Sequence, residues 1–155
     1  VVHYATRAAE KIREDNLVTN VMNLFLLTNH FNKKDPQYSN SIKIQFEYPT
    51  NDTIFIVKKA LQGLGKIYRP GYRYKKAGVI MLNLSPSSNI KGLFELNKQK
   101  SDSLMKSFDS INSRYGSTTI HTAAEGVNNK SWSMQRQKIS PSYTTRFSDL
   151  LEVIC

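Results

Sequence analysis

Apolar positions recur at helical spacing near the N-terminus, with charged residues between them. The apolar positions are Val2, Ala5, Ala8, Ala9 and Ile12. Charged side chains such as Arg7 and Glu10 fall on the opposite side, so the pattern predicts an amphipathic helix over residues 3–15. Residues 17–28 are then rich in β-branched and large apolar side chains, which predicts a strand.

A strict alternation of apolar and polar residues follows a polar loop over residues 30–40. The apolar positions are Ile42, Ile44, Phe46 and Tyr48, which predicts a strand with one buried face that ends at Pro49. Asn51 or Asp52 can cap a second helix. Its expected apolar stripe is Ile54, Val57, Leu61 and Leu64, and it is expected to end near Gly63 and Gly65. A third strand is predicted from about Tyr72 to Leu84.

The order helix, strand, strand, helix, strand indicates an α+β fold with two helices on one sheet. One further strand is expected ahead of the first helix, so that this chain would start just after that strand or include only its end. Beyond Ser85 the composition changes, and residues 86–100 are interpreted as a linker. Ser101 or Ser103 can cap a helix that ends at Gly116. Its apolar face is expected to contain Leu104, Met105, Phe108 and Ile111.

The net charge of the chain indicates which classes of binding partner to expect. The chain has 22 lysines and arginines against 12 acidic residues, a net charge of +10. This excess favours polyanions, with nucleic acid ahead of an acidic membrane because no basic helix has a wide apolar face. A solvated basic surface without a partner is the alternative. No segment is long and apolar enough to span a bilayer, and the single Cys155 fits a reducing cytosol.

The acidic residues argue against catalysis. Phosphoryl-transfer enzymes need carboxylates that converge on metal ions, whereas here acids such as Asp35, Glu47 and Asp109 are scattered singly. There is no HExxH motif and no cluster of cysteine and histidine. We therefore predict that the chain has no catalytic residues, no metal ligands and no cofactor of its own.

Basic and aromatic residues are interleaved from Tyr68 to Lys76. On a strand, Arg73 and Lys75 would share one face, and Tyr74 and Lys76 the other. One interpretation is a basic ridge along a phosphate backbone, joined by neighbouring strand residues; the other is an edge strand protected by lysines against aggregation. The residues predicted to contact DNA are Lys43, Gln45, Arg69, Arg73, Lys75 and Lys76.

Several segments together resemble the C-terminal third of the UmuC-type (ImpB/MucB/SamB) Y-family translesion DNA polymerases. The segments are residues 8–13, 38–41, 72–79, 134–136 and 140–146. The runs Arg-Tyr-Lys-Lys-Ala-Gly and Ser-Pro-Ser-Tyr-Thr-Thr-Arg are the specific ones. The resemblance implies that residues 1–85 form a little-finger domain, a four-stranded, mostly antiparallel sheet backed by two helices. Its open face would grip the DNA duplex or primer-template.

The same resemblance implies where the catalytic part, the C-terminal extension and the partner-binding segment lie. The polymerase chemistry and its Mg²⁺ would lie upstream, and residues 101–155 would be the family's C-terminal extension. The linker would hold a sliding-clamp peptide, of which only Leu93 and Phe94 match the family pattern. Other implied partners are the UmuD-type accessory dimer and RecA, in DNA repair and the SOS response of a bacterial cytoplasm. A protein-interaction module with incidental basic charge is the alternative function.

Overall fold

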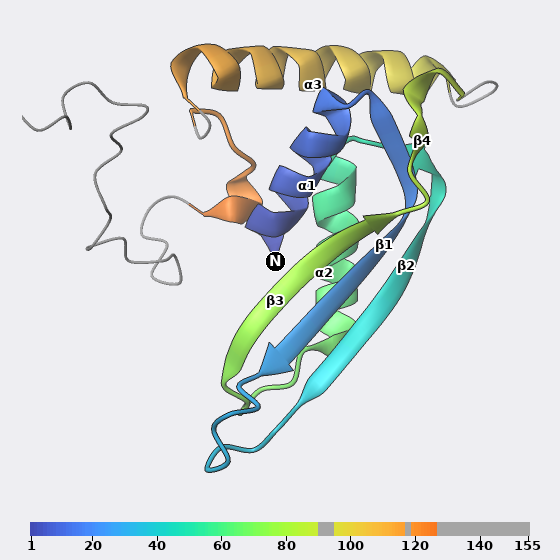
Figure 1. Cartoon of the computed structure of the whole chain (residues 1–155). Helices are drawn as coiled ribbons and strands as arrows, with labels where there is room; N and C mark the ends of the chain where they lie inside the picture. The colour runs from blue at the N-terminus through green and yellow to red at the C-terminus, as the bar shows by residue number, and fades with distance from the viewer. Residues whose placement is uncertain (90–94, 117–118, 127–155) are drawn as a thin grey trace, which may run out of the picture.

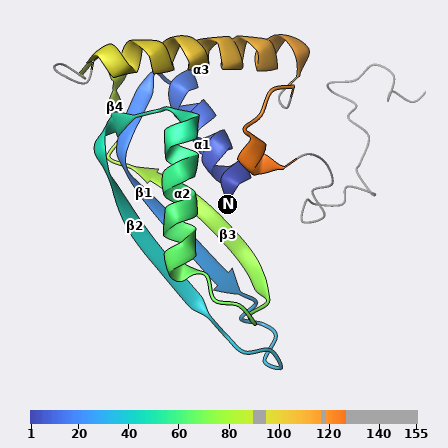
Figure 2. The ribbon, with the colours of Figure 1, turned by 180° about the vertical axis from the view of Figure 1, so that it is seen from behind.

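The computed structural model describes residues 1–89, 95–116 and 119–126. Three long strands form an antiparallel sheet in the order β2-β1-β3, and two helices lie on one of its faces (Figures 1 and 2). The elements are α1 (Val2–Glu14), β1 (Leu17–Thr28), β2 (Ser39–Thr50), α2 (Thr53–Ile67), β3 (Tyr74–Leu82), β4 (Ser85–Pro86), η1 (Ser87–Asn89), α3 (Glu95–Tyr115) and η2 (Ala123–Glu125). The α+β class is confirmed.

The fourth strand of the sheet follows β3 instead of preceding α1. It is the short β4, which pairs with the start of β1 through Leu17 and Pro86. The first two predicted strands are confirmed, although β2 runs through Pro49 to Thr50. A proline is tolerated there because β2 is an edge strand, where a missing backbone N–H need not cost a sheet hydrogen bond.

The core lies between the sheet and the two helices. Met22 and Leu24 of β1 are fully buried, and so are Ala5 and Ala9 of α1 and Ile56 of α2. The small alanines of α1 let the helix backbone approach the sheet and α2 closely. Burying a side chain such as Ile56 contributes about 1.5–3 kcal/mol of hydrophobic stabilisation.

Helix α2 buries only part of the face predicted for it, and Leu64 of that face packs against the core as expected. Val57 is buried as expected, but Ile54 and Leu61 are 51% and 42% exposed. The buried stripe follows Ile56, Ala60 and Gly63 instead. A Cβ on Gly63 would come within 2.3 Å of Ile44 Cδ1, so this glycine lets the helix lie close on β2. The helix continues through both glycines to Ile67.

The start of α2 confirms the predicted cap. Asp52 accepts hydrogen bonds through Oδ1 from the backbone N–H of Ile54 at 2.7 Å and of Phe55 at 3.2 Å. These bonds satisfy two of the N–H groups that a helix start leaves without an intrahelical partner.

Helix α3 begins at Glu95, ahead of the predicted caps Ser101 and Ser103, and lies across one end of the sheet (Figure 1). It ends at Tyr115, before Gly116 with φ +113°, as the sequence predicts. Met105 is buried, whereas Leu104 of the same predicted face is 52% exposed. Among the described residues, no helix combines the length and apolar character that a bilayer crossing requires.

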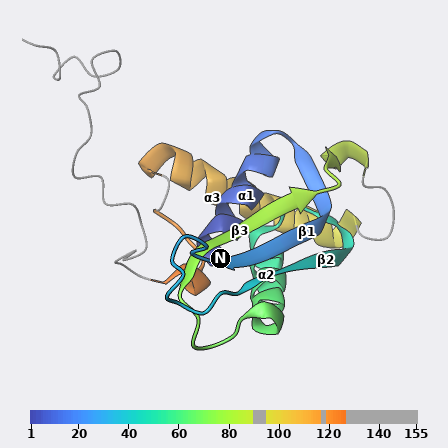
Figure 3. The same cartoon turned by 60° about the horizontal axis from the view of Figure 1, so that its bottom comes forward.

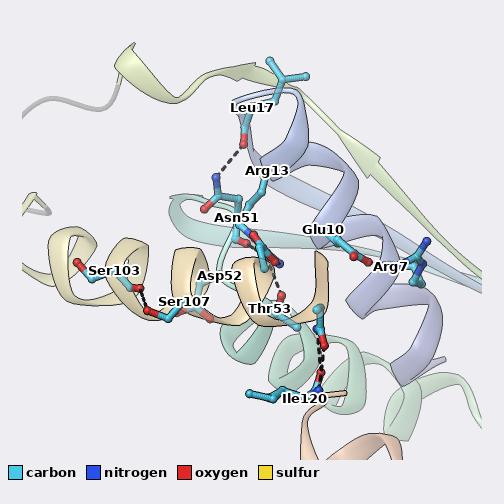
Figure 4. A network of polar contacts seen from close by, with 12 residues as sticks. Arg7, Glu10, Arg13, Leu17, Asn51, Asp52, Thr53, Ser103, Ser107 and Ile120 are labelled. Atoms are coloured by element: carbon cyan, nitrogen blue, oxygen red, sulfur yellow. Dashed lines mark hydrogen bonds and ion pairs between the residues drawn. The ribbon is translucent and has the colours of Figure 1, made fainter. Parts of the chain in front are cut away.

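Polar contacts join α3 to the rest of the fold, and Arg13 of α1 is at their centre (Figure 4). Its Nε and Nη2 donate to the two carboxylate oxygens of Asp109, each at 2.7 Å. Its Nη1 donates to the carbonyl oxygen of Asn51 at 2.8 Å and to Thr53 Oγ1 at 2.7 Å. We call these contacts the Arg13 junction; they connect α1, the start of α2 and α3.

Candidate nucleic-acid interface

The face of the sheet that points away from α1 and α2 is not covered by either helix (Figures 1 and 2). Strand register places four rows of residues on it, and the three rows that follow Gln45–Val21–Leu82 together we call the open face. The rows are Lys43–Asn23–Ile80, Ser41–Phe25–Gly78 and Ser39–Leu27–Lys76, each in the order β2-β1-β3. None of these residues is acidic, so the two lysines give this face a positive potential.

The structure brings three of the six predicted DNA contacts to this side of the sheet. Lys43 and Lys76 stand in the first and last rows, and both are exposed. Gln45 is also exposed and lies two residues beyond Lys43 along β2, on the same side of the strand. Lys43 and Gln45 therefore lie along one outer strand and Lys76 along the other, with β1 between them.

The centre of the open face is shaped by Phe25 and Gly78. A Cβ on Gly78 would lie 2.2 Å from Phe25 Cζ, so the aromatic ring covers the glycine on the neighbouring strand. Phe25 also lines a wide, shallow hollow with Asn23 and Ser41. A flat apolar centre flanked by cations suits a smooth polyanionic surface better than a small molecule.

The alternation predicted for the third strand is wrong at its start. Strand register shifts between Leu27 and Thr28, so that Lys76 pairs with Leu27 but Tyr74 pairs with Thr28. This β-bulge puts Tyr74 on the helix-covered face and Lys76 on the open face. Lys75 is the extra, exposed residue of the bulge.

Arg69 and Arg73 precede β3 and lie at the end of the sheet, away from its middle rows. The guanidinium of Arg69 lies 5.2 Å from the centre of the Tyr38 ring, a cation–π contact. Arg73 Nη1 lies 3.7 Å from Asp35 Oδ2, and its side chain is 84% exposed. Both arginines thus adjoin the loop between β1 and β2, which comes forward beside their turn in Figure 3.

The interleaved tyrosines hold this turn in place. The Tyr38 ring centre is 4.9 Å from that of Tyr72 and 6.1 Å from that of Tyr74. Tyr38 Oη donates to the carbonyl oxygen of Ile67 at 2.7 Å. Tyr74 Oη accepts from the backbone N–H of Arg69 at 2.9 Å. The tyrosines of the segment from Tyr68 to Lys76 therefore stabilise the turn, whereas its arginines and lysines remain exposed.

A groove between β2 and α2 adds cations that the sequence reasoning missed. Lys43 and Gln45 line it from β2, and Lys59, Gln62 and Lys66 line it from α2. The sequence held a usable signal, because residues 59, 62 and 66 recur at helical spacing.

Lys59 is fixed by two contacts inside this groove. Its Nζ donates to Glu47 Oε1 at 2.6 Å and lies 5.3 Å from the centre of the Phe55 ring. The hydrogen bond from Lys59 lowers the pKa of the Glu47 carboxyl, with a smaller contribution from the backbone of Glu47 itself. The Glu47 carboxylate is thereby held against Lys59 of α2.

Other predicted site residues remain untested. Leu93 and Phe94 of the predicted clamp peptide lie outside the described residues. The division into a finger domain, a linker over 86–100 and an extension stays a prediction.

Within residues 1–89, 95–116 and 119–126, no three side chains of histidine, cysteine, aspartate or glutamate group to hold a metal ion.

Comparison with known proteins identifies the family. Residues 1–93 match the impB/mucB/samB family C-terminal domain, and residues 102–153 match a domain of unknown function, DUF4113. Protein UmuC of Salmonella typhimurium is 37% identical over 156 residues, and protein ImpB of the same species is 37% identical over 153. These alignments cover 99% and 97% of this chain but 37% and 36% of the relatives.

Protein MucB of Escherichia coli is 35% identical over 147 residues, which is 94% of this chain and 34% of that relative. The chain thus spans little more than a third of the length of the curated relatives that it matches. Because the family domain covers more than half of the chain, we conclude that this protein belongs to the impB/mucB/samB family of UmuC-type Y-family proteins.

Proposed function

We propose that this chain grips the DNA duplex or primer-template for an error-prone translesion DNA polymerase. The open face supports this proposal most directly, since it presents Lys43 and Lys76 with no acidic residue among its rows. The groove beside it adds Lys66, while Lys59 in the same groove pairs with Glu47. Membership of the impB/mucB/samB family agrees with a place in such a polymerase.

The proposed contacts are with phosphates and not with base edges. Lysines act as point charges, and phosphate contacts position a protein without carrying sequence information. Two exposed strands and a groove can follow a backbone, whereas direct reading of bases needs a helix or ribbon seated in the major groove. Sequence-independent binding suits a polymerase that accepts any template.

The remaining parts of the proposal concern the full-length protein. We place nucleotide transfer and its Mg²⁺ ions in the part of such a polymerase beyond this chain, so that the chain itself does no chemistry. DNA repair in the SOS response, within a bacterial cytoplasm, is the setting that we infer.

A salt titration of duplex binding tests the grip. The double variant Lys43→Ala with Lys76→Ala should lower affinity about tenfold or more at low salt. It should also reduce the slope of log K against log salt by about 0.9 for each phosphate that the variant no longer binds. The matched control is Lys11→Ala with Lys106→Ala, which removes the same charge from exposed positions on α1 and α3. Equal reductions in the two variants, or binding that depends on sequence, would contradict the proposal.

Recruitment is the second part of the proposal. Leu93 and Phe94 would anchor the chain in the sliding clamp, and the UmuD-type dimer and RecA would bind elsewhere. Capture of the chain by immobilised clamp should disappear in Leu93→Ala with Phe94→Ala while duplex binding is retained. Persistent capture would remove the clamp peptide from the proposal and leave the DNA grip intact.

A further inference from the structure

One aromatic side chain stands apart from every hydrophobic cluster of the fold. Phe31 is 96% exposed, more than any other large hydrophobic side chain among the described residues. It lies in the loop between β1 and β2, which projects beyond the end of the sheet opposite α3 (Figures 1 and 2). Such exposure leaves its whole apolar surface in water, a cost that a binding partner would remove.

The loop that presents Phe31 is built by its own hydrogen bonds. Asn29 Oδ1 accepts from the backbone N–H of Phe31 at 3.2 Å, and Asn32 Oδ1 from that of Lys34 at 3.1 Å. Gln37 Nε2 donates to the carbonyl oxygens of Asn32 at 2.8 Å and Asp35 at 3.0 Å. A loop ordered in this way lowers the entropy that binding would otherwise cost.

Basic side chains occur in the same loop as the aromatic ring. His30, Lys33 and Lys34 are exposed in the same loop. The one acidic residue of the loop, Asp35, accepts from Asn32 Nδ2 at 2.8 Å and faces Arg73 at 3.7 Å. The last row of the open face before the loop contains Lys76. An exposed aromatic ring in a loop that also exposes lysines is the chemistry that binds a nucleobase and its flanking phosphates.

We propose that Phe31 stacks on an unpaired nucleobase of single-stranded DNA that continues from the duplex held by the open face. This inference rests on the proposed function and adds a second nucleic-acid site at the end of the sheet. A single phenyl ring has no hydrogen-bonding group to read base edges, so the site accepts any base. Lys33 and Lys34 hold the adjacent phosphates.

Energetics favour a single strand over a duplex at this site. Insertion between paired bases requires a base step to unstack, at a cost similar to what one stacked aromatic ring returns. An unpaired base already exposes a face, and stacking on it strengthens binding about fivefold to a hundredfold. The flanking cations add a salt dependence with a slope of about 0.7 per phosphate on single strands.

Two DNA hairpins of identical stem, one blunt and one with a single-stranded overhang, test the inference on the 155-residue chain. The chain should bind the overhang hairpin more tightly, and Phe31→Ala should lower that affinity about fivefold or more without changing binding to the blunt hairpin. Phe31→Trp should retain the preference and Phe31→Leu should not, because stacking needs a π face. An iodouracil base in the overhang should photo-cross-link to Phe31.

The controls separate this site from the open face. Phe31 makes no buried contact, so Phe31→Ala should melt at the same temperature as the parent chain. Lys43→Ala with Lys76→Ala should weaken binding to both hairpins. If this double variant bound both hairpins as tightly as the parent chain, the result would contradict the proposed duplex grip but not the stacking site. Equal overhang affinity for Phe31→Ala and the parent chain would overturn the stacking site. Equal weakening on both hairpins would overturn its assignment to single strands.

Discussion

Helices α2 and α3 are attached to the fold by opposite kinds of contact. Helix α2 packs on the sheet through Ile56, Val57 and Ala60, which are all buried. In the part of α3 whose side chains the structure describes, residues 101–115, only Met105 and Asn112 are buried, and the Arg13 junction ties the helix to α1 and the start of α2. Apolar packing spreads stability over many side chains, whereas a polar junction concentrates it in a few atoms.

The largest expected effect is on the apolar packing of α2. Ile56→Ala removes a fully buried side chain from the core and should lower the free energy of unfolding by about 2–5 kcal/mol. This reduction combines the smaller buried area with the cavity left between α2 and the sheet. Denaturant unfolding followed by circular dichroism measures it.

Ile54→Ala is the matched control, because it removes the same side chain two residues earlier, where it is 51% exposed. It should cost less than about 1 kcal/mol. Equal costs for the two variants would mean that α2 does not pack with the observed face. The stripe predicted from the sequence, which contains Ile54, would then regain support.

Removal of the Arg13 guanidinium should have the next largest effect. Arg13→Met keeps the aliphatic stem of a side chain that is 9% exposed but leaves Asp109 and Thr53 without their donor. The cost should be about 1.5–3 kcal/mol, as for hydrogen bonds to a charged group. Amide hydrogen exchange should show faster exchange in α3 but little change in α2, since α2 is also attached through its buried Ile56, Val57 and Ala60.

Arg7→Met provides the control for the junction. Arg7 also lies on α1, but its side chain is 44% exposed and pairs with Glu10 one turn away. Such a helix pair contributes about 0.3–0.5 kcal/mol. If Arg7→Met and Arg13→Met accelerated exchange in α3 equally, general weakening of α1 and not the junction would be responsible.

Asp52 contacts both helices, and its substitution should have a smaller effect than either of the preceding two. Oδ1 caps α2, while Oδ2 accepts from Ser101 Oγ of α3. Asp52→Ala should destabilise by about 1 kcal/mol through removal of the cap, measured by denaturant unfolding. Asp52→Asn retains a capping oxygen and should recover most of that stability. If asparagine were no better than alanine, the carboxylate would matter for its charge at the helix start and not as a cap.

The sequence predicted the parts of the fold that depend on periodicity. The alternation from Ile42 to Tyr48 and the spacing of Ala5, Ala9 and Ile12 appear in the structure as β2 and α1. The apolar stripe predicted for α2 is wrong at Ile54 and Leu61, because the helix packs instead through the small residues Ala60 and Gly63. Small residues mark close approach, which becomes visible only when the partner strand is known.

The sequence predicted that the site would be positively charged. It did not predict which residues lie together on one surface. Lys43 and Lys76 are far apart in sequence, and strand register is what puts them on one face. The bulge before Lys76 reverses the expected alternation, and a one-residue shift exchanges every side chain between faces. The Arg13 junction had no local signal either, since Asp109 lies 96 residues away.

The smallest expected effect concerns an exposed polar contact, between Lys59 and Glu47. The hydrogen bond from Lys59 lowers the pKa of Glu47 below its ordinary value of 4.5. A carboxyl whose pKa is lower in the folded state stabilises the fold above its unfolded pKa, and this contribution disappears as pH falls through the folded pKa. Lys59→Met should therefore raise the Glu47 pKa towards its ordinary value and alter stability little at neutral pH, where solvent screens the pair.

A carbon-detected NMR titration of the Glu47 carboxyl measures this shift. The rise should be incomplete, because a hydrogen bond to the backbone of Glu47 itself also lowers its pKa and survives the substitution. Lys58→Met is the control, since it removes the adjacent exposed lysine of α2 without touching the hydrogen bond. An unchanged midpoint in Lys59→Met would mean that the pair does not persist in solution. Lys59 would then be as available to phosphate as Lys43 and Lys66, and the groove beside β2 would carry more free positive charge than the contact to Glu47 allows.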